Sequence, residues 1–188
     1  MDFLHIYLDE FASIYENSLE NIRKVETLAA ISAINHNFTN NIRHALEHLS
    51  IAIKFALQNN PDKEQSTNYM KEAISHISNL APDSCQHIAG KRLKELRVFM
   101  GSSGFFANVE HAKKIHEEAI YFYTQGRNVR TASADEAVEY FIKTIERCIE
   151  AQKLVQFPGK IQKTTLLIAL SGWIITIMLF FDKIFKFL

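Results

Sequence analysis

The stretch SADEAVEYFIKTIERCIEAQKLV, residues 133–155, decides the fold class of this 188-residue chain. Its opening, Ser133 to Glu136, has the spacing of a capping box, in which two side chains bond backbone amides that the start of a helix leaves free. Further along, one stripe of positions recurs at intervals of three and four, which is typical of an amphipathic helix. The positions of this stripe, here called the seam, are Val138, Phe141, Ile145, Cys148, Gln152 and Val155. The stretch therefore predicts a long helix with one buried face.

The seam has two interpretations. Its heptad-like spacing suits a helix that faces its own bundle, and it equally suits a helix that packs partly against neighbouring subunits. The second interpretation assigns Val138, Phe141, Ile145 and Gln152 to a contact between copies of the chain.

Outward from this helix, the rest of the chain up to residue 157 has the same helical character. Apolar residues at helical spacing predict helices over residues 3–14, 19–31, 38–58, 63–80, 82–101 and 108–125. The chain has only 6 Gly and 3 Pro, too few for the many turns of a sandwich or barrel. Two cysteines cannot form a disulfide framework. We expect an all-α helical bundle over residues 1–157.

The charge balance limits the partners of this bundle. Lys and Arg together number 21, as do Asp and Glu, so the formal net charge is zero and a strongly basic nucleic-acid coat is excluded. One local exception is the basic run Lys91, Arg92, Lys94 and Arg97. This run forms a solvated face, or it contacts RNA or anionic lipid headgroups.

The C-terminal sequence TTLLIALSGWIITIMLFF, residues 164–181, carries no charge. As a helix it is about 27 Å long, close to the roughly 30 Å of a bilayer core. A buried core helix is the alternative. We expect a transmembrane helix that follows a junction at 158–163 and precedes an interfacial tail at 182–188. The N-terminal sequence is not that of a secretory signal, which predicts a cytoplasmic bundle on a single-pass anchor in the inner membrane.

One stripe of the expected span suits close packing. Thr165, Ala169, Gly172 and Thr176 follow one another at steps of four, three and four, so they share one side of a helix. Small residues let helices approach closely, and hydroxyl groups tolerate water. This stripe would contact a neighbouring copy or line a pore, and plain anchoring is the alternative. Any pore needs several copies, because a single helix encloses nothing.

The hexapeptide RHALEH, residues 43–48, is the most specific chemical pattern in the chain. Arg43 can hold a phosphodiester with paired hydrogen bonds, and His44 and His48 can move protons near neutral pH. Arg43 and His48 lie about 140° apart around a helix, so they would meet only across two copies. His44 and His48 also have the spacing of metal ligands, but no cluster of further ligands completes a site, and we expect neither a metal nor a cofactor.

This hexapeptide resembles the RxxxxH motif of the HEPN superfamily, in which Asn, Asp or His often follows the arginine. The resemblance implies an all-helical bundle, and in the ribonuclease members a composite site shared by a dimer. In its small size, this hexapeptide and the expected membrane helix, the chain resembles the small membrane accessory proteins of type VI-B CRISPR systems. That resemblance implies a ring, a pore in the inner membrane and stronger antiviral defence beside an RNA-guided effector. In such proteins the HEPN-like motif need not be a working nuclease.

Three hypotheses for function follow. The first is a membrane-anchored HEPN-like accessory protein that oligomerises and permeabilises the inner membrane. The second is a tail-anchored ribonuclease toxin that cleaves RNA without metal through Arg43, His48 and His44 of two copies. The third is a non-enzymatic membrane adaptor. The expected partners are further copies of the chain, the lipid bilayer and an RNA-guided effector or RNA.

Overall fold

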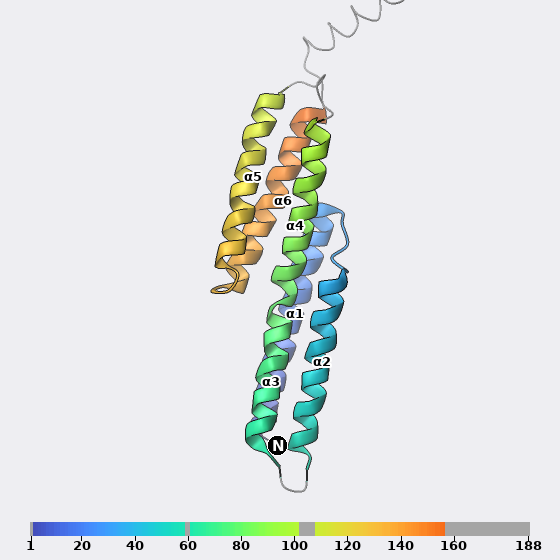
Figure 1. Ribbon diagram of the computed structural model, residues 1–188, viewed down its shortest axis with the longest axis vertical. Helices are drawn as coiled ribbons and strands as arrows, with labels where there is room; N and C mark the ends of the chain where they lie inside the picture. The colour runs from blue at the N-terminus through green and yellow to red at the C-terminus, as the bar shows by residue number, and fades with distance from the viewer. Residues whose placement is uncertain (1, 59–60, 102–107, 157–188) are drawn as a thin grey trace, which may run out of the picture.

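The computed structural model describes residues 2–58, 61–101 and 108–156, and over these ranges the chain forms helices and no strand. The helices are α1 (Asp2–Ala29), α2 (His36–Ala56), α3 (Lys63–Ser78), α4 (Leu80–Gly101), α5 (Val109–Val129) and α6 (Ala134–Gln156) (Figure 1). The all-α fold class is confirmed.

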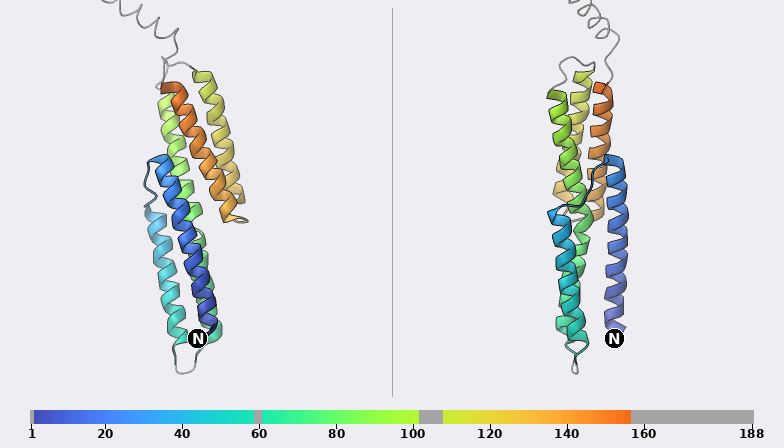
Figure 2. Two further views of the ribbon diagram at one scale, coloured as in Figure 1. Left: turned by 180° about the vertical axis from the view of Figure 1, so that it is seen from behind. Right: turned by 90° about the vertical axis from the view of Figure 1, so that its right-hand side faces the viewer.

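The helices form a long rod in two halves (Figure 1). One half contains α1, α2 and α3, and the other contains α5, α6 and the end of α4. The consecutive helices α3 and α4 together extend over nearly the whole length of the rod (Figure 2). In the second half, α4 packs on α6. The helix α6 ends at the tip of the rod opposite the N-terminus, beside the start of α5.

The helices α3 and α4 are separated at Asn79 for a local reason. Pro82 has no N–H to donate to the carbonyl of Ser78, so one helical hydrogen bond cannot form there. The Asn79 side chain instead donates to the Ser75 carbonyl at 2.9 Å, and the Asp83 amide resumes the pattern by donating to Asn79 at 3.1 Å.

The sequence-based prediction for the first helices was wrong in one respect. Residues 3–14 and 19–31 were expected as separate helical segments, but α1 is continuous from Asp2 to Ala29. Ser18 interrupts the apolar pattern, yet it is buried and its hydroxyl group donates to the Ile77 carbonyl of α3 at 3.4 Å. A polar residue that faces a neighbouring helix is thus a packing position and not a break.

Two side chains stabilise the end of α1 and the residues that follow it. Ala30 has a positive φ of 51°, as is usual just after a helix. The Arg92 guanidinium of α4 donates to the Ala29 carbonyl, and the Glu26 carboxylate accepts from the Ala33 amide at 2.5 Å. The first bond satisfies a carbonyl that the helix end leaves free, and the second ties the following segment back to α1.

Two apolar clusters hold the rod together. The first, called the junction core, joins the two halves and includes Val25 of α1, Leu80 and Ile88 of α4, and Phe141 and Ile145 of α6. The second lies toward the tip and packs α4, α5 and α6; its buried members are Leu96, Ala112, Ile115, Ala119, Cys148, Ala151 and Val155.

The seam of α6 is accounted for by these two clusters. Its apolar members are all buried within this chain: Val138, Phe141, Ile145, Cys148 and Val155. Gln152 is partly exposed and lines a cavity of about 190 Å³ with Arg92 and Phe99. The structure therefore supports the interpretation in which the seam faces its own bundle. An interface between copies must use other residues than Val138, Phe141 and Ile145.

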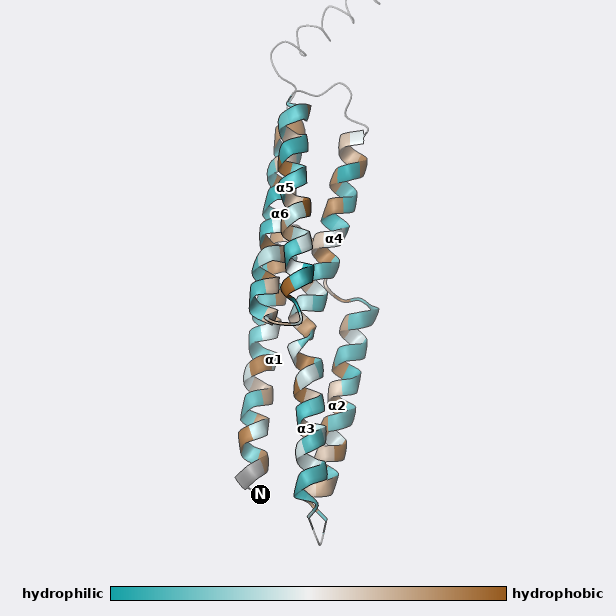
Figure 3. Cartoon of the chain, turned by 60° about the vertical axis from the view of Figure 1, so that its left-hand side comes forward, coloured by the Kyte–Doolittle hydropathy of each residue, from teal (hydrophilic) through white to brown (hydrophobic). Residues whose placement is uncertain are grey.

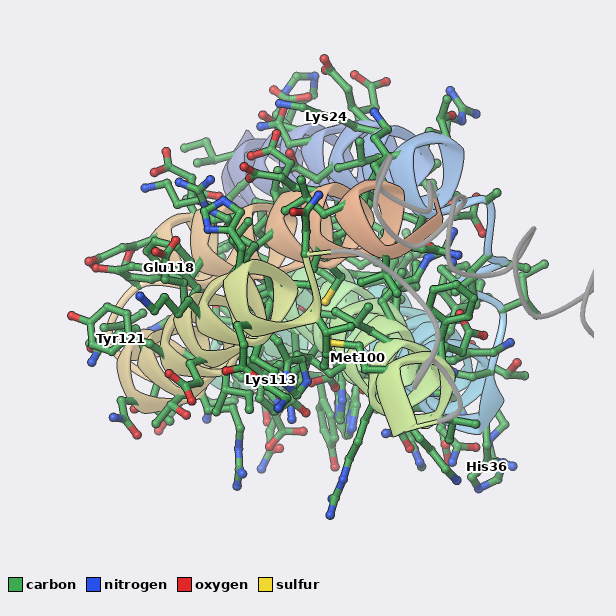
Figure 4. The ribbon with its side chains drawn as sticks, turned by 90° about the horizontal axis from the view of Figure 1, so that it is seen from above. Lys24, His36, Met100, Lys113, Glu118 and Tyr121 are labelled. Carbon is green, nitrogen blue, oxygen red and sulfur yellow. The ribbon has the colours of Figure 1, made fainter. Side chains whose placement is uncertain are left out.

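Hydrophilic and apolar residues alternate along each helix, as Figure 3 shows. Seen along the rod, the side chains of Lys24 and Glu118 lie toward its rim (Figure 4), and both are exposed. Among the helices in the described ranges, none is both long and apolar enough to cross a membrane. The expected junction at 158–163, the span at 164–181 and the tail at 182–188 lie outside the described residues.

Candidate functional site

The RHALEH hexapeptide lies in the middle of α2, which packs along α3. The start of α2 is fixed by Asn35, whose side chain accepts a hydrogen bond from the Phe38 amide at 2.9 Å. Further along, Ala45 and Ala52 are buried, and the Ser66 hydroxyl of α3 donates to the Ala52 carbonyl at 2.8 Å. Small residues and this bond bring the two helices close.

Five aromatic rings from α2 and α3 stack in one line along this contact. Their order is Phe55, Tyr69, His48, His76 and His44, so that α2 and α3 contribute rings in turn. The successive ring centroids are 5.8, 5.9, 5.3 and 5.3 Å apart. We call this set the ring column.

The three histidines lie together at one end of the ring column. The planes of His48 and His76 are only 8° apart, and those of His44 and His76 are 26° apart. Two carboxylates lie beside them: Glu72 Oε2 is 3.0 Å from His48 Nδ1, and Glu47 Oε2 is 3.7 Å from His44 Nδ1. The buried His48 Nδ1 forms no hydrogen bond within the described residues. Its contact with Glu72 therefore meets the distance of an ion pair but not the geometry of a hydrogen bond.

The environment of His76 disfavours its charged form. Partial burial, followed by the neighbouring His48 and His44, lowers the pKa of His76 below its ordinary value, and Glu72 opposes the change. A proton on either neighbouring ring therefore makes a proton on His76 less favourable. The arrangement can respond to pH, but it does not aim a base and an acid at one reacting atom.

Arg43 stands apart from the ring column. Its side chain is exposed, and within the described ranges it has no ion pair or hydrogen bond. The structure therefore brings His44 and His48 together through His76 but does not bring Arg43 to them. Within one chain, the three predicted site residues do not converge on a common point.

Sequence reasoning missed two members of the ring column, Tyr69 and His76. Both lie on α3 and are seven positions apart, as are His48 and Phe55 on α2. This matched spacing of rings was the available signal, because seven residues are about two turns of a helix.

Two further chemical roles find no support in the described part of the chain. No group of His, Cys, Asp and Glu side chains there is arranged to hold a metal ion, and the histidine rings stack face to face. Burial raises the pKa of the Cys85 and Cys148 thiols to about 12, so neither supplies a thiolate nucleophile at neutral pH.

The lowered pKa of His76 predicts how stability depends on pH. Because the unfolded chain binds this proton more readily, the free energy of unfolding should fall as the pH drops below about 6.5. His116 acts in the same direction, since burial and Arg97 lower its pKa. We expect His76→Phe, which keeps a ring but cannot titrate, to make this fall shallower.

The measurement is urea unfolding of the full chain at several values between about pH 7.5 and pH 5.5. His111→Phe is the matched control, because His111 is exposed and outside the ring column. An equally steep fall in wild type and His76→Phe would contradict this account of the ring column.

Comparison with known proteins gives no relative for this fold and site. No protein-family model matches the chain, and neither a curated protein nor a solved structure matches it.

Proposed function

We propose that this chain is a membrane-anchored helical protein that assembles into a ring and permeabilises the inner membrane. The observation that carries the proposal is the uncharged sequence at residues 164–181, which follows an amphipathic bundle. Its length suits a bilayer core. The position of α6 supports the proposal, because this helix ends at one tip of the rod, at the point of the bundle nearest in sequence to the proposed span (Figure 1).

Permeabilisation requires several copies. A single transmembrane helix satisfies its own backbone hydrogen bonds but encloses no path for ions. The stripe Thr165, Ala169, Gly172 and Thr176 provides the surface through which helices approach or line the opening. Without charged residues in the span, the opening is wide or gated by apolar side chains and has little ion selectivity.

The setting suggested by the RHALEH hexapeptide is antiviral defence. Its likeness to the HEPN motif, together with the membrane segment, supports a role as accessory protein beside an RNA-guided CRISPR effector. In this role Arg43, His44 and His48 need not cleave RNA. Their positions suit that role, since the two histidines pack in the ring column and Arg43 is exposed on α2.

The ribonuclease alternative makes a stricter demand on the same residues. It requires Arg43 of one copy and His48 of another to meet, while His48 is stacked between Tyr69 and His76. RNA cleavage by the purified full chain that disappears in both Arg43→Ala and His48→Ala would favour this alternative over the pore. The third role, a membrane adaptor, would be favoured if an unrelated anchor in place of residues 164–181 preserved function.

The experiment is the mass of the detergent-extracted full chain, measured by mass photometry. We expect a ring of several copies for wild type and a smaller mass for Gly172→Leu, because leucine blocks close approach of helices. Ile174→Leu, off the stripe, is the matched control and should leave the mass unchanged. A monomer in the wild-type sample would refute the ring, and an unchanged mass for Gly172→Leu would refute this packing stripe.

A further inference from the structure

A cavity of about 480 Å³ lies where the start of α2, the middle of α4 and the end of α5 meet. It shares no residue with the ring column. Its volume is in the range of small-molecule sites, about 300–1,000 Å³. The elements around it meet near mid-length of the rod, away from the tip where α6 ends (Figure 1).

The lining of this cavity is positively charged, although the whole chain has a formal net charge of zero. Lys91, Lys94 and Arg130 contribute three cations, and Asp83 contributes the one carboxylate among the residues around it. With His87 neutral, the lining carries a net charge of +2, because three positive charges exceed one negative charge by two. Such a concave positive surface concentrates anions.

The one carboxylate is already engaged. Asp83 pairs with Arg130 and also accepts a hydrogen bond from the Asn41 side chain at 3.0 Å. Arg130 is further held by a 3.0 Å hydrogen bond to Gln86 Oε1. These contacts fix the guanidinium against the wall, and its remaining N–H groups are available because a guanidinium has five donors.

The two lysines are available for a ligand. Lys91 and Lys94 are both exposed, and neither forms an ion pair within the described ranges. The other two cations of the basic run lie elsewhere: Arg92 bonds Ala29 and Glu95, and Arg97 is outside the cavity lining. The structure thus separates the two lysines that line the cavity from the rest of the run.

Tyr123 adds a neutral donor to the lining. Its ring packs against Phe141 of the junction core, with centroids 5.8 Å apart, and its hydroxyl group reaches Gly90. A Cβ atom at Gly90 would lie 3.1 Å from the Tyr123 hydroxyl oxygen, which is tighter than an ordinary contact. Glycine at this position therefore leaves room for the hydroxyl at the cavity wall.

We propose that this cavity binds a small molecule carrying a phosphate group. Lys91, Lys94 and Arg130 neutralise the phosphate, and Tyr123, His87 and Asn37 donate hydrogen bonds to its oxygens or to the attached group. The cavity is larger than one phosphate needs, which favours a phosphorylated organic molecule over the free ion. The site does not depend on the proposed membrane function.

The test is calorimetric titration of the full chain with two probes, inorganic phosphate and adenosine 5′-monophosphate. We expect adenosine monophosphate to bind and each of Lys91→Met and Lys94→Met to weaken its binding by about tenfold, since each removes a charge-assisted contact. Lys113→Met is the matched control, because Lys113 of α5 pairs with Glu110 and is outside the lining. Its affinity should equal that of wild type.

Tyr123→Phe provides a second variant that keeps the ring in the core and removes only the hydroxyl group. This variant should weaken binding of adenosine monophosphate several-fold.

Equal affinity for both probes would identify the free ion as the ligand, and tighter binding of adenosine monophosphate would identify an organic phosphate. Absence of binding by either probe at millimolar concentration would overturn the proposal. Equal losses of affinity in Lys91→Met and Lys113→Met would also overturn it. The same holds if the chain binds only polynucleotide and inorganic phosphate does not compete with that binding.

Discussion

Replacement of Phe141 by alanine is expected to lower the free energy of unfolding by about 3–5 kcal/mol. The Phe141 side chain is fully buried and lies in the junction core, where α1, α4 and α6 meet. Its loss removes apolar burial and leaves a cavity between the two halves of the rod. Urea unfolding of the full chain in mild detergent, followed by circular dichroism, measures the change.

Glu139→Gln is the matched control for this variant, because Glu139 lies two positions away on α6 and is exposed. Its effect should stay within about 0.5 kcal/mol. A loss of less than about 1 kcal/mol in Phe141→Ala would contradict the assignment of Phe141 to the core that joins the halves.

Gly126 provides an independent check of the same contact. A Cβ atom at Gly126 would lie 2.8 Å from Phe141 Cε1, closer than real Cβ contacts. Gly126→Ala alone should therefore destabilise the protein by about 1–3 kcal/mol through overpacking. In the Phe141→Ala background the same change should cost nothing, because the ring that it meets is gone. Additive effects of the two changes would show that the residues are not in contact.

The second large effect is expected in the proposed membrane segment. Leu170→Asp together with Ile174→Asp should transfer the protein from the membrane fraction to the aqueous fraction of a cell lysate. An aspartate at the centre of a span costs about 2.5–3.5 kcal/mol for insertion, so two cost about 5–7 kcal/mol. The same variant should no longer release dye from vesicles that the wild-type chain permeabilises.

Leu170→Ala with Ile174→Ala is the matched control, since it shortens the same two side chains without adding charge. This control should stay with the membrane fraction and should still release dye. If the aspartate variant sediments with membranes as fully as the control, residues 164–181 are not the anchor.

Local signals in the sequence predicted most helix boundaries. Ser133 was expected to cap α6, and its hydroxyl accepts a hydrogen bond from the Glu136 amide at 3.3 Å. The expected start of a helix at residue 63 is likewise confirmed, and the Asp62 side chain caps α3 by accepting a hydrogen bond from the Gln65 amide at 3.0 Å. Such caps depend on residues three apart, so a sequence displays them directly.

Where the sequence misled or fell short, the cause lay in contacts between distant helices. Ser18 was expected in a gap between two helices, but its bond to Ile77 places it inside the bundle. Similarly, α5 was expected to end near Gln125, but it continues to Val129, with Gly126 packed against Phe141.

The candidate sites could be predicted only in part, again because they depend on contacts between distant helices. His44 and His48 were visible as a pair at helical spacing, but His76 joins them only through the register of α2 against α3. The cavity around Lys91 and Arg130 depends on residues far apart in the sequence that three helices bring together. No local pattern encodes such a register, because it results from packing along the whole length of the helices.

The most direct test of the membrane proposal is alkaline extraction of membranes from cells that express the unaltered full chain. A protein held by one helix within the bilayer remains in the pellet after the wash, and this is the result that we predict. Recovery of the chain in the supernatant, before or after the wash, would contradict the central claim.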